Sequence, residues 1–176
     1  MTPPGDAMKI WETRLPKIVM FFGWLLEHGR LNTRAYLHHR NIRSLEESWC
    51  VHCPGELETD IHIFSRCPKA QSIWATLGVS VPDTLAHRPW DIGVHIPLPD
   101  VVRVDFFLLT LWHVWKARNI MIFEQANYSP LDVLNRVAKD LDHWSCRYKK
   151  HFAAILEWRA WLAFCISPDS FPNPPL

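Results

Sequence analysis

The chain has 176 residues, 48% of them hydrophobic, with ten tryptophans and a formal net charge of +1. This length and hydrophobic content are enough for one ordinary domain, or two small ones, with a buried core. The near-neutral charge is not typical of a dedicated DNA-binding protein. The chain has five cysteines, no secretory-type N-terminus and no apolar run near the roughly 20 residues of a membrane span. We therefore expect an intracellular protein of the nucleus or cytoplasm, neither secreted nor associated with a membrane.

The first regular elements are predicted after a polar entry of fifteen residues. Pro16 is well placed as a first helical residue, and the helix that follows, over 17–28, is apolar on nearly every side. We expect this helix to lie at the centre of a core. Gly29 can end it in a left-handed cap, and Thr33 can cap a second, short helix over 34–40.

The most distinctive stretch is the motif C-x2-C-x8-H-x4-C, formed by Cys50, Cys53, His62 and Cys67. Three thiols and one imidazole within eighteen residues match the number and type of ligands in a closed tetrahedral zinc site. Four protein ligands leave no open position for water. The sequence therefore predicts one Zn²⁺ ion, with a structural and not a catalytic role.

Other interpretations of these residues are open at the level of sequence. Cysteines and lone histidines are often simply buried. His52 lies between the first two cysteines and competes as the fourth ligand. A disulfide between Cys50 and Cys53 is a further alternative, although it does not suit a reducing location.

A third helix is expected over 69–77, with Gly78 at its end. The segment after it, residues 79–99, contains Pro82, Pro89, Pro97 and Pro99 and shows little periodicity. Such a segment is typical of a linker. It would separate a front half that carries the zinc site from a helical back half.

Two long helices are predicted in the back half. The first runs from about Asp100 to Gln125, with Lys116 and Arg118 expected at its solvated edge. A serine, a proline and an acid at residues 129–132 indicate the start of the second, which follows a seam of apolar residues to about Phe164. Lys149-Lys150 is a candidate break in it.

The predicted fold class is mostly α: a small zinc-stabilised helical domain with an irregular zinc loop, followed by long helices. No strand pattern is convincing. The predicted organisation is a zinc-binding domain over 9–78, a proline-rich linker over 79–99, a helical region over 100–166 and a disordered tail over 167–176.

A series of short motifs surrounds the Cys/His site. They are Ile10-Trp11, Pro16-Lys17, Phe22-Gly23-Trp24, Gly29-Arg30-Leu31-Asn32-Thr33-Arg34, Leu37-His38-His39-Arg40, Glu58-Thr59, His62-Ile63-Phe64, Cys67-Pro68 and Trp74. In order and spacing this series resembles the zinc-binding domain of reverse transcriptases from plant LINE-type (non-LTR) retrotransposons. The segment 111–119, followed by Phe123, is similar to the one that joins this domain to an RNase H domain in such polyproteins. Asn32 and Asn41 depart from residues common in that family, but no ligand is lost.

The resemblance implies a module that works beside nucleic acid, and the charge pattern of the front half agrees. Residues 28–43 carry arginines and no acid, whereas residues 44–61 carry acids and neither Lys nor Arg. A basic face beside the metal could track phosphates, and its histidines could contact bases. The predicted nucleic-acid-binding residues are Arg30, Arg34, His38, His39, Arg40, Arg43, Arg66 and Lys69. The simpler interpretation is that these side chains are only solvated.

An enzyme is not predicted. The chain has no Tyr-x-Asp-Asp polymerase motif, and after residue 145 only Glu157 and Asp169 remain of the carboxylates that an RNase H needs. We expect a non-catalytic zinc-binding module derived from a retrotransposon reverse transcriptase that assists binding of single-stranded RNA or DNA. Reverse transcriptase and RNase H domains are its expected protein partners. The alternative is a zinc-stabilised helical scaffold or protein-interaction fragment with no nucleic-acid role.

Overall fold

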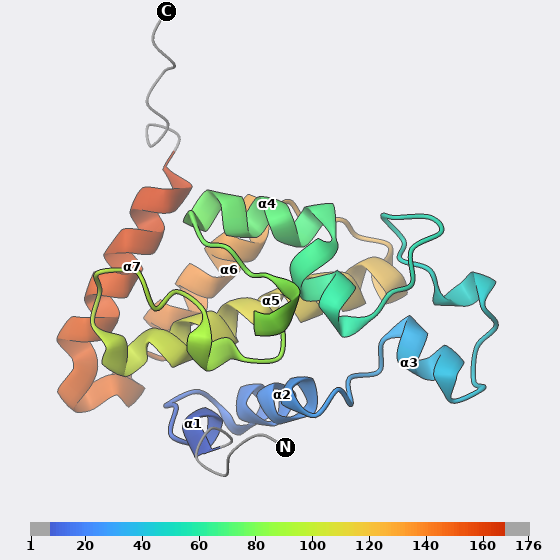
Figure 1. The fold of residues 1–176 in the computed structure, drawn as a ribbon. Coiled ribbons are helices and arrows are strands. Elements are labelled where there is room, and N and C mark those ends of the chain that lie inside the picture. Colours follow the sequence, from blue (N-terminus) through green and yellow to red (C-terminus); the bar gives the residue numbers. More distant parts are fainter. Residues whose placement is uncertain (1–7, 168–176) are drawn as a thin grey trace, which may run out of the picture.

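The computed structural model describes residues 8–167 (Figure 1). Over this range the chain is mostly helical and forms no strand, and Trp49 and Leu57 make one isolated antiparallel bridge. The predicted fold class is therefore confirmed. The α-helices are α1 (Met8–Trp11), α2 (Lys17–Glu27), α3 (Arg34–His39), α4 (Pro68–Leu77), α5 (Arg103–Glu124), α6 (Pro130–His143) and α7 (Phe152–Ile166). Shorter helical turns are η1 (Glu46–Ser48), η2 (His62–Arg66), η3 (Asp83–Leu85), η4 (Pro89–Asp91), η5 (Asp100–Val102) and η6 (Ser145–His151).

Helix α5 forms the centre of the fold. The four consecutive side chains from Phe106 to Leu109 are fully buried. Because consecutive residues of a helix point to different sides, such a run needs neighbours all round it. Figure 1 shows α5 crossing the middle of the molecule, with α2 on one side and α4 and α6 on the other.

The central position predicted for the helix over 17–28 is wrong. Helix α2 lies at the edge of the molecule and buries one face only, while Ile18 and Phe21 remain 61% and 53% exposed. The buried face packs closely on α5, because a Cβ atom added at Gly23 would lie only 2.9 Å from Leu108 Cδ1. Both helices are apolar, so composition alone did not distinguish the edge helix from the central one.

The segment predicted as a linker, residues 79–99, lies against the core. Trp90 and Ile92 are buried, and their backbone carbonyls accept hydrogen bonds from Arg103 Nη1 at 2.6 and 2.8 Å. Trp158 Nε1 donates to the carbonyl of Pro99 at 2.9 Å. The boundaries predicted around this segment stay predictions. The predicted disordered tail, from residue 167, lies outside the described residues except for its first residue.

Local signals in the back half predicted its elements well. Helix α6 begins with a capping box, in which Ser129 Oγ accepts from the backbone N–H of Asp132 and the Asp132 carboxylate accepts from that of Ser129. The predicted break at residues 149–150 falls in η6, where Lys149 is non-helical, and α7 follows. One continuous set of buried side chains joins the front and back halves.

Candidate metal centre

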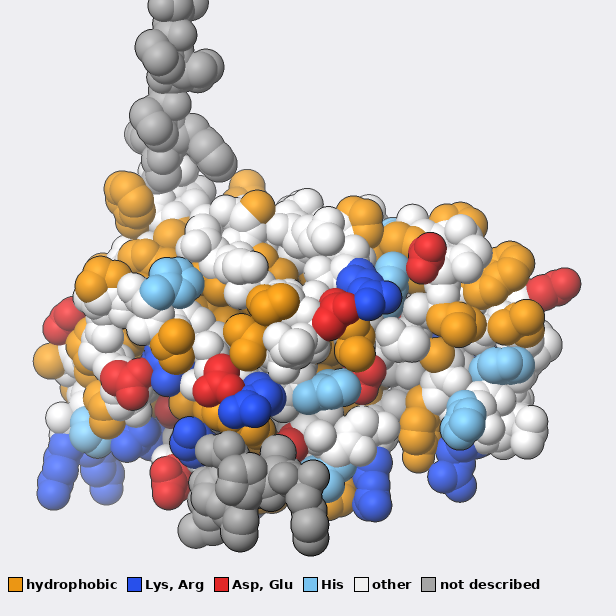
Figure 2. All heavy atoms as spheres, viewed as in Figure 1, with side chains coloured by type: hydrophobic (Ala, Val, Ile, Leu, Met, Phe, Trp, Pro, Cys, Tyr) orange, Lys and Arg blue, Asp and Glu red, His pale blue; other side chains and the backbone are white. Residues whose placement is uncertain are grey.

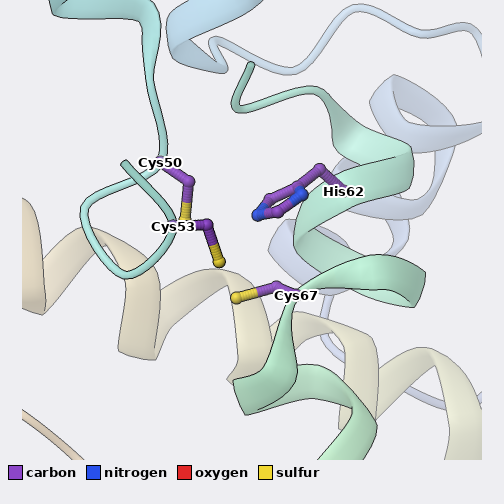
Figure 3. Close-up of side chains that lie close together, drawn as sticks. All are labelled: Cys50, Cys53, His62 and Cys67. Carbon is purple, nitrogen blue, oxygen red and sulfur yellow. The ribbon is translucent and has the colours of Figure 1, made fainter. Parts of the chain in front are cut away.

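The first two cysteines of the motif lie on a short loop that is closed at its base. In this zinc loop, residues 48–58, the backbone N–H of Cys50 donates to the carbonyl of Glu56 at 2.8 Å, and that of Glu58 donates to Ser48 at 2.9 Å. Between these bonds the chain reverses through Gly55, whose φ of +90° favours glycine. The reversal places the sulfurs of Cys50 and Cys53 on one side of the loop (Figure 3).

The other two predicted ligands frame the π-helical turn η2. His62 is its first residue, and the backbone N–H of Cys67 donates to the carbonyl of His62 at 2.7 Å, an i→i+5 bond. Cys67 is also the N-cap of α4, with Pro68 at the first helical position. The wide turn therefore accounts for the x4 spacing, and it places the Cys67 sulfur at a helix N-terminus, which favours a thiolate.

The four side chains converge on one point. One ligand atom from each of Cys50, Cys53, His62 and Cys67 lies within 4.8 Å of all the others, and all but Cys53 are buried (Figure 3). Nε2 of His62 is buried without a hydrogen-bond partner. Ligand bonds of about 2.0–2.3 Å to a central ion would give donor separations inside this limit. The donor set, its closeness and the unpaired imidazole nitrogen fit one tetrahedral structural zinc.

The thiols of this cluster also affect one another's acidity. Hydrogen bonding between their sulfurs raises the pKa of Cys50 and lowers the pKa of Cys67. Burial raises the pKa of Cys53. Because zinc binds thiolates, metal binding must release protons from these groups.

The two alternatives to this ligand set are less compatible with the geometry. His52 is exposed and stands outside the four-residue cluster. All five cysteines are free thiols, so no disulfide joins Cys50 to Cys53.

A buried ion pair behind the zinc loop was missed in the sequence. Glu58, at the end of the loop, is 2% exposed, and its Oε1 accepts from Nε of Arg118 on α5 at 3.1 Å and pairs with Nη2 of the same residue. The backbone N–H of Arg34 donates to the same oxygen at 3.1 Å. The prediction that Arg118 is solvated is therefore wrong, because its side chain is only 12% exposed. The only feature of the sequence that could have indicated the burial of Arg118 was its position in segment 111–119, which contains two tryptophans.

Some of the predicted nucleic-acid-binding residues already have partners within the protein. Arg34 Nη1 donates to the carbonyl of Trp49 at 3.0 Å, and His38 Nδ1 lies 3.0 Å from the carbonyl oxygen of Arg43. Arg66 Nε bonds both oxygens of Asp83, at 3.1 and 2.9 Å. Lys69 Nζ donates to Asn127 Oδ1 at 2.9 Å. Each of these side chains therefore has at least one polar contact within the protein.

The remaining predicted residues are directed to solvent. Arg30, His39 and Arg40 are exposed and Arg43 is half-buried. The guanidinium of Arg30 lies 5.5 Å from the ring centre of Trp24, and that of Arg40 lies 5.8 Å from that of Tyr36. Figure 2 shows Lys and Arg side chains spread along the whole lower edge of the molecule, from the α7 end on the left to α3 on the right, without forming one continuous block.

Comparisons with known proteins agree with this site. Residues 3–74 match the model of the family described as zinc-binding in reverse transcriptase. An Arabidopsis thaliana protein that carries the name "putative ribonuclease H protein" is 26% identical over 124 residues, which is 65% of this chain and 19% of that relative. The chain thus spans about a fifth of the relative that it matches. No solved structure matches the chain.

Within residues 8–167, no helix combines the length and hydrophobicity needed to cross a membrane. The family match covers all four residues of the Cys/His cluster, and the matching family is a zinc-binding and not a catalytic one. The geometry and the comparison therefore agree on the front of the chain: residues 3–74 are similar to the zinc-binding domain of reverse transcriptases, and Cys50, Cys53, His62 and Cys67 form a site for one structural zinc.

Proposed function

We propose that this chain is a non-catalytic module that assists a reverse transcriptase in binding single-stranded RNA or DNA. The observation that carries the proposal is the exposed set Arg30, His39 and Arg40, which lie shortly after α2 and at the end of α3. Its two guanidiniums lie over aromatic rings and have no carboxylate partner among the described residues. Cations held near aromatic rings suit a strand that presents phosphates and unstacked bases.

The zinc supports this function indirectly. Four protein ligands leave it no position for substrate, so the ion would hold the zinc loop and η2 in place. Arg34, at the start of α3, bonds to both ends of that loop through Trp49 and Glu58. The metal would therefore fix the orientation of α3 and of the cations that α3 presents. Reverse transcriptase and RNase H domains are the proposed protein partners, and plant LINE-type retrotransposons the proposed origin.

The test is a salt titration of the binding of zinc-loaded protein to fluorescent single-stranded RNA and DNA, followed by anisotropy. Arg30→Gln with Arg40→Gln should weaken binding at every sequence and flatten the dependence of log K on log salt by about 0.7 for each lost phosphate contact. Arg34 is left unchanged because its bonds hold the zinc loop.

A matched control removes the same charge elsewhere. Lys150→Gln with Arg159→Gln changes an exposed lysine of η6 and an arginine of α7 that pairs with Asp142 at 2.9 Å. This control should bind as the unchanged protein does. Absence of binding at low salt would reject the nucleic-acid role and favour the helical scaffold. Equal weakening by both double variants would show that only net charge matters.

A further inference from the structure

A second basic feature lies in the back half of the molecule, outside the set predicted from sequence. A groove of about 480 Å³ runs between α5 and α6. Its lining consists of His113, Lys116, Tyr128, Asp132, Asn135, Arg136, Lys139 and Asp140. We call it the α5/α6 groove.

The cations of the α5/α6 groove are not paired with carboxylates. Lys116, Arg136 and Lys139 form no salt bridge among the residues that the structure describes. Arg136 is held in place by stacking, because its guanidinium lies 4.1 Å from the ring centre of Tyr128. Lys116 Nζ lies 5.9 Å from the ring centre of Trp112. Such contacts restrict the side chains and leave their N–H groups available to a ligand.

The two carboxylates of the groove, Asp132 and Asp140, are hydrogen-bonded to other side chains of the protein. The carboxylate of Asp132 accepts from the backbone and hydroxyl of Ser129 at 2.8 and 2.7 Å. Oδ2 of Asp140 lies 2.7 Å from Nε2 of His113, whose side chain is only 4% exposed. Burial lowers the pKa of His113, against the hydrogen bond to Asp140, which raises it. The groove therefore presents three cations beside two carboxylates that are hydrogen-bonded within the protein.

This mixture of groups matches a nucleotide chain better than an acidic polypeptide. Phosphates would meet the cations, while base amino groups or ribose hydroxyls could donate to Asn135 and to the free lone pairs of the carboxylates. An acidic side chain has no donor to offer those oxygens. Tyr128 also lines a small, separate pocket of about 60 Å³ whose lining includes Cys50 and Cys67.

We infer that the α5/α6 groove binds the phosphate backbone of single-stranded nucleic acid, with Arg136 and Lys139 as its principal phosphate contacts. This inference rests on the proposed function and adds a second contact region to it. It places part of the strand outside the family-matched segment, on residues 113–140.

The test measures anisotropy of a fluorescent oligo(U) with full-length, zinc-loaded protein. Arg136→Gln with Lys139→Gln should weaken binding about tenfold for each lost contact at low salt, and flatten the salt slope by about 0.7 per contact. Glutamine preserves helix propensity, and unchanged zinc content and circular dichroism would verify the fold. Lys150→Gln with Arg159→Gln, which removes the same charge outside the groove, should bind as the unchanged protein does.

The outcomes separate the two proposals. If the unchanged protein does not bind oligo(U), the proposed function fails and this inference fails with it. If it binds, and Arg30→Gln with Arg40→Gln weakens binding while Arg136→Gln with Lys139→Gln does not, only the groove is rejected. Displacement of oligo(U) by polyglutamate with the same dependence on Arg136 would overturn the choice of nucleic acid in favour of an acidic polypeptide.

Discussion

Glu58 connects the zinc loop to the central helix through one side chain. Its carboxylate is buried, and its partners are Arg118 of α5 and the backbone N–H of Arg34 at the start of α3. Removing one member of a buried ion pair leaves the other charge uncompensated, which costs more than the pair contributes net. Breaking this contact should therefore lower the stability of the zinc-loaded protein.

We predict that Arg118→Met lowers the free energy of unfolding of the zinc-loaded protein by about 3–5 kcal/mol. The measurement is urea denaturation followed by tryptophan fluorescence. The matched control is Arg159→Met, because Arg159 pairs with an aspartate whose side chain is 58% exposed, and such a pair contributes at most about 1 kcal/mol. Equal losses in the two variants would contradict the role assigned to Arg118.

Asp105 is a second buried acid, and it should make stability depend on pH. It is 1% exposed, and its carboxylate accepts from the backbone N–H of Arg14 at 2.8 Å. Burial raises its pKa to about 6. The folded state then binds this proton more tightly than the unfolded state, so the free energy of unfolding falls as pH rises from the ordinary Asp value to about 6.

Asp105→Asn should remove this loss. The free energy of unfolding of the variant, relative to that of the unchanged protein, should be about 2 kcal/mol higher at neutral pH than near pH 4. Urea denaturation of both proteins across this range measures the difference. Asp132→Asn provides a control of opposite sign, because hydrogen bonds from Ser129 lower the pKa of Asp132. That variant should lose stability at neutral pH relative to acid. A parallel pH dependence in Asp105→Asn and the unchanged protein would contradict the assignment.

At the scale of elements, η4 and the residues after it are held on α5 by a close approach at Gly93. This glycine has a φ of +71°, and an added Cβ atom would lie 2.2 Å from Phe107 Cε2. Phe107 is itself fully buried in the central helix and cannot move away freely. The site therefore combines a left-handed backbone with a lack of space.

Gly93→Ala should lower the free energy of unfolding by about 3 kcal/mol, from overpacking and the left-handed conformation together. Gly78→Ala is the matched control. Gly78 has a φ of +64° but no atom within 4 Å of an added Cβ, so only the conformational cost of about 1 kcal/mol applies. Thermal denaturation of the two variants would measure the difference. A smaller effect at Gly93 than at Gly78 would show that the contact with Phe107 relaxes without cost.

What could be predicted from the sequence depends on how local the determining interaction is. The zinc ligands were identified because coordination requires particular side chains at close spacing, and the start of α6 because Ser129 and Asp132 cap it within one turn. The pairing of Glu58 with Arg118 joins residues sixty positions apart, and no local pattern encodes it. The packing of residues 79–99 was missed for the same reason, because Arg103 satisfies carbonyls eleven and thirteen positions away.

The site shows the same division. The residues that could hold the metal were identified directly from the motif. The sequence did not show which basic side chains are already bonded to other residues of the protein. Arg66 belongs to the predicted basic set, yet its guanidinium forms an ion pair with Asp83, which is seventeen positions away. Arg136 was not predicted, because its significance comes from Tyr128, which lies just before α6, and from a groove that two helices form together.

At the scale of the whole molecule, the two halves share one core but differ in what holds them together. The buried side chains of α5, α6 and α7 include Phe106, Leu134 and Trp158, all fully buried. The zinc loop has few buried apolar side chains, since Val51 and Leu57 are 39% and 43% exposed. Burial of apolar surface can maintain the helices, whereas the loop depends on its metal.

Zinc removal should therefore unfold the zinc segment, which we define as residues 48–67, and leave the central helices folded. After chelation or Cys53→Ser, we expect hydrogen exchange over residues 48–67 to accelerate by about two orders of magnitude or more, while amides of α5 change by less than about threefold. Loss of the segment would also release Arg34 and the start of α3, because their bonds go to Trp49 and Glu58. Cys146→Ser, at an exposed cysteine outside the cluster, is the control and should change neither region. Equal acceleration in α5 would mean that metal and core unfold as one cooperative unit, with the Glu58–Arg118 pair as the contact through which the loss is transmitted.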